Sequence, residues 1–315
     1  MKTAFVFSGQ GSQSVGMGLS LYDNFRVARD VFEEVDDALH EKLSTLMFHG
    51  DMARLTQTQN AQPAIMAVGM AVVRTLEHEL GCPLTRKAAY MAGHSLGEYT
   101  ALCASGALTL ADTAKILQMR GLAMAWGSAI IYGGMMAVLG LPREQIDVLI
   151  EQASDTEERA YVANDNCIGQ VIVSGDIRAL ARLKVEAEKL GARKVIPLAV
   201  DGAFHSPYMK PAADEMVDAL RRLSLSKPRV PVISNTTAMP ETVPQKIKKN
   251  LLAQMTGTVR WRESVDFMLA NQTDTFVECA NGKVMAGLIK RISPTARLLS
   301  VGDASGVAEA VQLLA

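Results

Sequence analysis

The chain has 315 residues, of which 49% are hydrophobic and 21% charged, and its formal net charge is −1. This length can bury the core of one large domain with an insert, and the composition excludes the disordered and collagen-like classes of protein. A balanced charge also argues against a general nucleic-acid binder, whose surface would carry a large basic excess.

The chain begins with a predicted strand, TAFVF at 3–7, whose aromatic and β-branched residues favour extended structure. Ser8 and Gly9 interrupt this apolar start too early for the core of a secretory signal peptide. A glycine-rich loop follows, SGQGSQSVGMG, but no GK[ST] comes after it and no third glycine completes GxGxxG in register. Nucleotide binding is therefore only weakly indicated. The glycines on either side of Gln10 would instead let the backbone approach a ligand closely.

Helical periodicity dominates the rest of the chain and alternates with short apolar runs. The predicted helices lie at about 25–40, 61–79, 96–105, 109–125, 210–222 and 258–270, and the predicted strands near 88–92, 230–234 and 275–279. Strands that alternate with helices indicate an α/β fold with a mainly parallel sheet covered on both faces. The longest apolar run, residues 64–73, has ten residues and is too short to cross a bilayer, which requires about 20.

One stretch, residues 130–200, has the order strand, helix, strand, strand, helix, strand, which is the βαββαβ pattern of a ferredoxin-like unit. We therefore predict a larger α/β-hydrolase-like domain with a parallel sheet core, formed by residues 1–129 and 201–315, with the smaller ferredoxin-like domain inserted into it. A cleft between two such domains is the natural place for a substrate.

The stretch GHSLG places Ser95 between Gly93 and Gly97, after a predicted strand and before a predicted helix. This is the nucleophile-elbow pattern, in which the glycines remove side chains that would clash in a tight strand-to-helix turn. A simpler interpretation is that Ser95 only caps the helix, which would need neither glycine. The motif alone leaves both interpretations open, because five-residue patterns recur by chance.

A serine nucleophile needs a base, and the chain has five histidines. His94 adjoins Ser95 and is expected to point away from it, and three others lie in polar helix or loop contexts. His205 differs, because it lies in VDGAFHSPYMK, directly after the last strand of the inserted unit and beside the proposed cleft. We predict that His205 is the base, and the alternative is a loop histidine bonded to the backbone.

Arg120 is the charged residue from which most can be inferred. On the predicted helix 109–125 it shares a face with Thr113, Leu117 and Met124, so its guanidinium is expected to point toward the interior. A buried guanidinium requires a carboxylate partner. That partner is either an Asp or Glu of the chain, in a structural ion pair, or a carboxylate of the substrate.

The oxyanion of an acyl-transfer intermediate needs N–H donors, and the candidates are the amide of Leu96 and the loop around Gln10. No metal is indicated, because the four cysteines are far apart and form neither a CxxC pair nor a His/Cys cluster at metal-ligand spacing. The same spacing suggests no disulfide framework, which fits a reducing cytoplasm.

A series of motifs follows along the chain: GQGSQSVGMG, TQNAQPAI, GHSLGEYTAL, QMRGLAM, NDNCIGQVIVSG, AFHSPYMKPAA, LLAQMTGTVRW and NGKVMAGLIKRI. In this order, and over essentially the full length, the chain resembles the malonyl-CoA:acyl carrier protein transacylases of bacterial type II fatty acid synthesis. One such motif carries little weight, whereas the ordered series is specific.

The resemblance implies a role for each matching residue. Ser95 would take the malonyl group as an ester, His205 would be the base, and Gln254 would hold His205 through its carbonyl. Arg120 would bind the malonyl carboxylate. The oxyanion amides would be those of Gln10 and Leu96, and the pocket or the approach of the thioester would be lined by Gln62, Met124, Asn166 and Gln170.

The reaction implied is a ping-pong transfer from malonyl-CoA to the phosphopantetheine thiol of acyl carrier protein, without cofactor or metal. We expect a cytoplasmic monomer with no nucleic-acid or membrane partner. The alternatives are a serine hydrolase or thioesterase with the same elbow, an acyltransferase of a polyketide pathway, and a noncatalytic carrier-docking module. Because acyl carrier protein is acidic in this resemblance, the candidate docking surfaces are basic: 246–249, Lys189 with Arg193 and Lys194, and Lys290 with Arg291.

Overall fold

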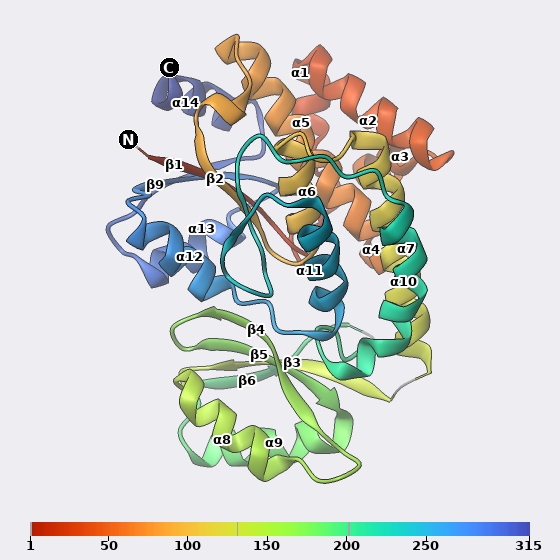
Figure 1. The fold of residues 1–315 in the computed structure, drawn as a ribbon, viewed down its shortest axis with the longest axis vertical. Coiled ribbons are helices and arrows are strands. Elements are labelled where there is room, and N and C mark those ends of the chain that lie inside the picture. The colour runs from red at the N-terminus through yellow and green to blue at the C-terminus, as the bar shows by residue number, and fades with distance from the viewer. Residues whose placement is uncertain (1, 131, 201) are drawn as a thin grey trace.

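The computed structural model describes residues 2–130, 132–200 and 202–315 and contains two separate sheets (Figure 1). The larger sheet contains β1 (Thr3–Phe7), β2 (Ala88–Gly93), β7 (Val232–Ile233), β8 (Pro240–Glu241), β9 (Thr275–Cys279) and β10 (Arg297–Val301). The smaller sheet contains β3 (Gly133–Leu139), β4 (Ala160–Cys167), β5 (Gln170–Asp176) and β6 (Lys194–Pro197). The predicted α/β class is confirmed.

Helices connect these strands and cover both sheets. Around the larger sheet lie α1 (Leu19–Asn24), α2 (Arg26–Leu39), α3 (Leu43–His49), α4 (Met52–Thr56), α5 (Thr58–Leu80), α6 (Leu96–Ala104), α7 (Leu110–Ala129), α10 (Lys210–Arg222), α11 (Pro244–Thr256), α12 (Trp261–Ala270), α13 (Val284–Ile292) and α14 (Ala304–Leu314). The smaller sheet carries α8 (Arg143–Ala153) and α9 (Ile177–Lys189), and two short 3₁₀ helices are η1 (Leu84–Arg86) and η2 (Pro207–Met209). Among the described residues, no helix combines the length and the apolar character that crossing a membrane requires.

The larger sheet has the strand order β10-β9-β1-β2-β7-β8, with all neighbours parallel except β8, which pairs antiparallel with β7. Its central strand β1 is buried on both faces. Phe5 and Phe7 pack into the core that contains α5, whereas Ala4 and Val6 pack against α12 and α13 on the other face. A strand covered on both sides is apolar throughout, which is why TAFVF could be identified from the sequence.

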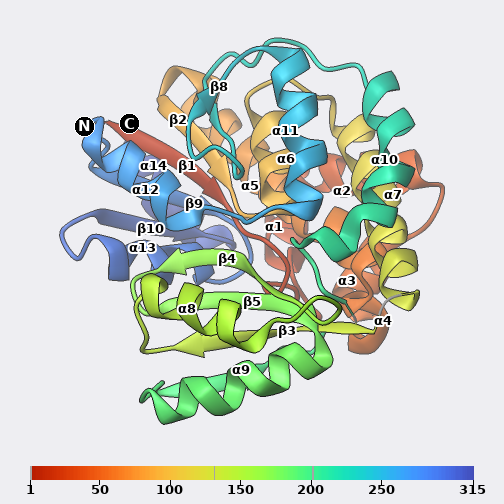
Figure 2. The same ribbon diagram turned by 60° about the horizontal axis from the view of Figure 1, so that its bottom comes forward.

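The smaller sheet follows the order β3-α8-β4-β5-α9-β6 along the chain, and its strands lie in the order β4-β5-β3-β6 with antiparallel neighbours. Helices α8 and α9 cover the face that points away from the larger sheet (Figure 2). Met135 and Ala137, on the other face, belong to the core of the larger sheet. The predicted domain limits at residues 1 and 201 lie outside the described residues.

A main-chain link joins the smaller sheet to the segment between α11 and α12. The N–H of Asp165 on β4 donates to the carbonyl of Val259 at 3.0 Å, and the N–H of Val259 donates to the carbonyl of Ala163 at 2.8 Å. The segment just before α12 therefore lies beside the edge strand β4 in a short parallel pairing and ties the smaller sheet to the segment that follows α11.

Candidate active site

Ser95 lies in a sharp turn between β2 and α6. Its backbone has φ 54° and ψ −111°, a conformation that residues other than glycine rarely adopt. A Cβ atom on Gly93 would lie 1.9 Å from the carbonyl oxygen of Gly97, and one on Gly97 would lie 2.5 Å from that of Phe7. Both glycines are required because these neighbours are backbone atoms. The Ser95 side chain makes no capping hydrogen bond to α6, so the simpler helix-cap interpretation is wrong.

His205 reaches Ser95 from 110 residues away along the chain. The Ser95 hydroxyl lies 2.8 Å from Nε2 of His205, and Nδ1 of His205 lies 2.8 Å from the main-chain carbonyl oxygen of Gln254. A carbonyl oxygen only accepts, so Nδ1 carries the proton and Nε2 is free to accept the proton of the hydroxyl. The geometry is that of a nucleophile and its base, oriented by a neutral third group.

Burial sets the ionisation of this imidazole. His205 is 6% exposed, and desolvation together with the positive charge of Arg120 lowers the pKa of His205 to about 3. An imidazole is neutral above its pKa, so His205 remains available as a base across the whole physiological range of pH.

We therefore expect the rate at which an uncharged fluorophosphonate modifies Ser95 to be nearly constant between pH 5 and pH 8. A histidine with the ordinary pKa of about 6.5 would lose about 30-fold over that interval, because only a few per cent of it is neutral at the lower pH. Mass spectrometry of the modified peptide at timed intervals measures the rate. A steep fall toward pH 5, in protein that circular dichroism shows to be folded, would contradict the neutral base.

Arg120 lies against the same hydroxyl. Its guanidinium is buried, and Nη2 donates to Oγ of Ser95 at 3.1 Å and to Oε1 of Gln254 at 2.9 Å, while Nη1 donates to Oε1 of Gln62 at 2.7 Å. Within the described part of the chain no carboxylate lies within 4.0 Å of it, and its Nε has no partner. Of the two alternatives, a structural ion pair with an Asp or Glu of the chain is therefore not found, and the buried cation beside the nucleophile makes no direct contact with a carboxylate of the described residues.

The two predicted oxyanion donors follow adjacent strands. Leu96 is the first residue of α6, so its N–H has no acceptor within the helix. Gln10 lies in the loop after β1, where Oγ1 of Thr58 donates to its Oε1 at 3.3 Å. Because β1 and β2 are parallel neighbours, with Phe7 paired to Gly93, their carboxyl ends bring both residues to one edge of the sheet.

A pocket of about 400 Å³ opens onto Ser95 and His205. Its other walls include Gln10, Met124, Met135, Asn164, Leu198 and Phe204. The wall is thus mainly apolar, with a few polar groups near the hydroxyl, as is usual for a site that binds a small organic group.

The remaining predicted pocket residues lie at different depths. Gln62 is fully buried behind the pocket as an acceptor of the guanidinium described above. The side-chain oxygen of Asn166 lies 2.8 Å from Nε2 of His94, which holds that imidazole away from the base position. The structure does not bring Gln170 to the pocket, and its side chain instead accepts a hydrogen bond from Arg291.

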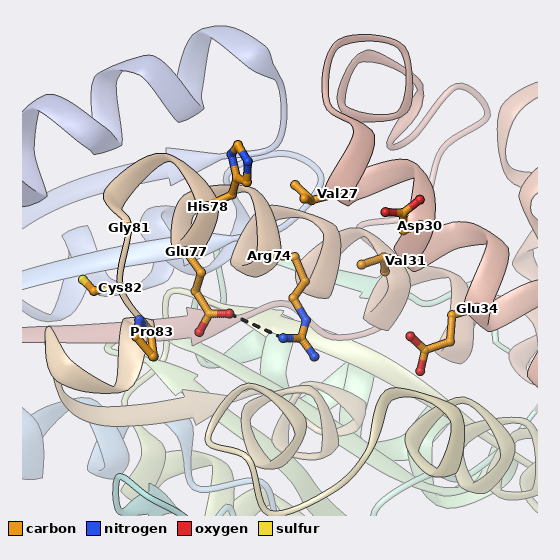
Figure 3. A pocket seen from close by; sticks show the side chains of 10 residues that line it. All are labelled: Val27, Asp30, Val31, Glu34, Arg74, Glu77, His78, Gly81, Cys82 and Pro83. Atoms are coloured by element: carbon orange, nitrogen blue, oxygen red, sulfur yellow. Dashed lines mark ion pairs between the residues drawn. The ribbon is translucent and has the colours of Figure 1, made fainter.

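A second hollow, of about 490 Å³, lies between α2 and the end of α5 (Figure 3). Arg74 pairs with Glu77 at 3.7 Å inside it, and Asp30 and Glu34 project from α2 beside them. His78 lies on its rim, but none of its lining residues is a serine or threonine. Of these two cavities in the described part of the chain, only the pocket at Ser95 brings a hydroxyl and a histidine together.

Asn235 holds the backbone of the nucleophile and was not predicted by any of the motifs. Asn235 follows β7, and its Oδ1 accepts the N–H of Ser95 at 2.7 Å. The signal that could have found it is the pairing of β7 with β2, since the carboxyl ends of parallel neighbours meet at one edge.

Comparison with known proteins agrees with this geometry. The sequence pattern of the acyl transferase domain family matches residues 4–299. The chain belongs to this family. As a member of the acyl transferase family, it is an acyltransferase enzyme.

This acyl transferase is 37% identical over 313 residues to the malonyl CoA-acyl carrier protein transacylase of Bacillus subtilis, which covers 99% of the chain and 97% of the relative. It superposes with a TM-score of 0.96 on the acyl-carrier-protein-S-malonyltransferase of Bartonella henselae, at 44% identity and with 100% and 99% of the two chains covered. A third structure, a type II PKS acyl-carrier protein in complex with its malonyl-transacylase, gives a TM-score of 0.95 at 32% identity, with 99% and 100% covered.

Proposed function

We propose that the chain transfers a malonyl group from malonyl-CoA to the phosphopantetheine thiol of acyl carrier protein and so supplies fatty acid synthesis. One observation carries the proposal. The hydroxyl of Ser95 lies between a neutral base, His205, and a buried guanidinium, Arg120, that has no carboxylate of the chain as its partner. The transacylase names of relatives that cover nearly the whole chain support the same substrate.

The first half-reaction forms an ester on Ser95. The hydroxyl gives its proton to Nε2 of His205 as Oγ attacks the thioester carbonyl, and the carbonyl of Gln254 stabilises the imidazolium through Nδ1. The N–H groups of Gln10 and Leu96 hold the oxyanion. When the intermediate collapses, the C–S bond breaks and the CoA sulfur takes the proton from Nε2.

The second half-reaction reverses these steps with another thiol. The phosphopantetheine thiol gives its proton to Nε2 of His205, its sulfur attacks the malonyl ester, and the proton returns to Oγ of Ser95 as the ester bond breaks. Arg120 binds the free malonyl carboxylate throughout, with Met124 and Phe204 in the apolar wall beside it. Neither half-reaction calls for a cofactor or a metal.

We also propose the finer description of the architecture. Residues 1–129 and 201–315 form an α/β-hydrolase-like domain, supported by the parallel sheet and the elbow after β2. Residues 130–200 form a ferredoxin-like insert, supported by its βαββαβ order and antiparallel pairing. A cytoplasmic monomer stays a prediction, as does docking of the carrier on the exposed basic segments.

The complex of a type II PKS acyl-carrier protein with its malonyl-transacylase supports a related second candidate, delivery of the malonyl group to a polyketide carrier. The chemistry at Ser95 is the same in both cases. Comparing transfer rates to the fatty-acid carrier and to a polyketide carrier from the same cell distinguishes them.

Rapid mixing with malonyl-CoA tests the proposed function. We expect release of one equivalent of CoA per active site in a burst, and a malonyl adduct on the peptide that contains Ser95. Holo acyl carrier protein should then discharge the adduct as malonyl carrier protein. Free malonate as the main product would indicate a hydrolase or thioesterase, and the absence of any adduct in folded protein would overturn the covalent step.

A further inference from the structure

Two amide side chains fix the strained backbone of the nucleophile. Oδ1 of Asn235 accepts the N–H of Ser95 at 2.7 Å, and Nε2 of Gln254 donates to the carbonyl of Ser95 at 3.0 Å. Nδ2 of Asn235 also donates to the carbonyl of Gly93 at 2.7 Å. A backbone conformation of this kind persists only where its surroundings hold it, so these bonds help to keep the hydroxyl in place.

One buried carboxyl group anchors both of these residues. Glu98 lies in the first turn of α6 and is 2% exposed. Its Oε2 accepts a hydrogen bond from the main-chain N–H of Asn235 at 3.1 Å and one from the side-chain Nε2 of Gln254 at 2.7 Å. A buried carboxyl group is costly unless it is hydrogen-bonded, and here each bond goes to a residue that holds Ser95.

The side chain of Gln254 also connects Glu98 to the buried guanidinium of Arg120 by hydrogen bonds. Nε2 of that amide donates to Glu98, which leaves its Oε1 directed at the guanidinium of Arg120, 2.9 Å away. The carboxylate of Glu98 thus fixes the orientation of the Gln254 amide, so that the amide oxygen faces Arg120. The other ionisable neighbours are neutral, since burial raises the pKa of Tyr99 to about 12 and lowers that of His205 to about 3. Asn235, Ser234 and Gln254 carry no charge.

We propose that Glu98 is a positioning residue of the acyl-transfer site: it anchors the main chain of Asn235 and the side chain of Gln254, the two residues that hold Ser95, and supplies the buried negative charge opposite Arg120. The inference rests on the proposed function, because only a substrate with a free carboxylate would compete with Glu98 for the positive charge. Such a substrate brings a second anion close to the first, and the site then favours protonation of Glu98.

The ionisation of Glu98 makes this competition measurable. Desolvation raises the pKa of Glu98 to about 7, against hydrogen bonds from Asn235 and Gln254 and the charge of Arg120, which lower it. A bound carboxylate raises the pKa of Glu98 further, so substrate binding takes up a proton. The affinity for a carboxylate substrate is then greatest below pH 7 and falls as the pH rises through the pKa of the bound state.

Calorimetry on the Ser95→Ala variant, which should bind the thioester without reacting with it, tests the role of the Glu98 charge. Between pH 6 and pH 8.5 we expect the affinity for malonyl-CoA to fall about tenfold, which corresponds to a rise of about one unit in the pKa on binding. Acetyl-CoA has the same CoA phosphates and no free carboxylate, so its affinity should not show this fall. With Glu98→Gln added, the fall for malonyl-CoA should vanish. An unchanged fall in that double variant, or equal falls for the two thioesters, would overturn the inference.

Transfer kinetics test the anchoring. Glu98→Gln retains the shape and the acceptor oxygen, so we expect it to keep most of kcat. Glu98→Ala leaves the main-chain N–H of Asn235 and the amide of Gln254 without this acceptor and should lower kcat about 100-fold. Glu77→Ala, which removes a carboxylate from the second hollow, is the matched control and should behave as the unaltered chain. Wild-type kcat in Glu98→Ala would contradict the inference.

These results remain separate from the test of the proposed function. If the unaltered chain forms no malonyl adduct on Ser95, the proposed function fails whatever the Glu98 variants do. If the adduct forms and the Glu98→Gln double variant keeps the pH dependence, only the role of Glu98 fails. Thermal melting of each variant shows whether it is folded, and the isosteric Glu98→Gln keeps the test decisive if Glu98→Ala does not fold.

Discussion

We expect Ser95→Ala to abolish the CoA burst and the malonyl adduct and to lower kcat by at least about 10,000-fold. The expected loss is this large because the hydroxyl oxygen is the only atom of the site that forms a bond to the acyl group, and a base without its nucleophile contributes little. Stopped-flow release of CoA measures the burst, and mass spectrometry of the intact protein measures the adduct.

Ser105→Ala is the matched control for that variant. Ser105 is also buried, lies at the other end of α6 and donates to the carbonyl of Leu102 at 2.8 Å, so it tests removal of a buried hydroxyl from the same helix. We expect a full burst from it. If Ser95→Ala still accumulated a malonyl adduct, another residue would be the nucleophile and the role of the elbow would be wrong.

The parts of the fold that could be predicted from the sequence are those with a strong local cause. Strands β1 and β9 are buried at every residue and consist mainly of apolar, aromatic and β-branched residues, so their predicted limits matched the structure end to end. Strand β10 was missed because Arg297 is exposed and Ser300 is half-buried, which interrupts the apolar pattern. Helix α11 was missed although Ile247, Leu251 and Met255 recur at helical spacing, because lysines surround the first of them and mask the apolar pattern.

The same difference between local and long-range causes decides which site residues could be predicted. Ser95 and its two glycines were found because the turn is local and its steric needs appear within five residues. The contacts of Asn235 and of Glu98 span 140 and 137 residues, and they depend on which strands become neighbours. No spacing rule within one sequence gives that order. Arg120 was placed in the interior correctly, but its partners are amide and hydroxyl groups rather than a carboxylate of the chain.

Arg120→Ala should lower kcat/KM for malonyl-CoA by at least about 100-fold while lowering that for acetyl-CoA only a few-fold. The reason is that the substrate carboxylate would be buried without its charged partner, and truncating one member of a buried charge pair costs about 3 kcal/mol. Initial rates with the two thioesters, measured at pH 6.5 and limiting concentrations, give the ratio directly.

Arg120→Lys is the informative companion variant, because it keeps the positive charge but loses the planar fork that binds a carboxylate through two N–H groups. We expect Arg120→Lys to recover part of the rate of malonyl transfer. It should not recover the part of the preference for malonyl-CoA over acetyl-CoA that depends on the second hydrogen bond. Gln62→Ala removes the acceptor at 2.7 Å that orients the guanidinium and should raise KM for malonyl-CoA more than it lowers kcat. Equal losses for malonyl and acetyl transfer in Arg120→Ala would mean that the guanidinium acts on Ser95 and Gln254 alone, because those two contacts are present whichever acyl group is bound.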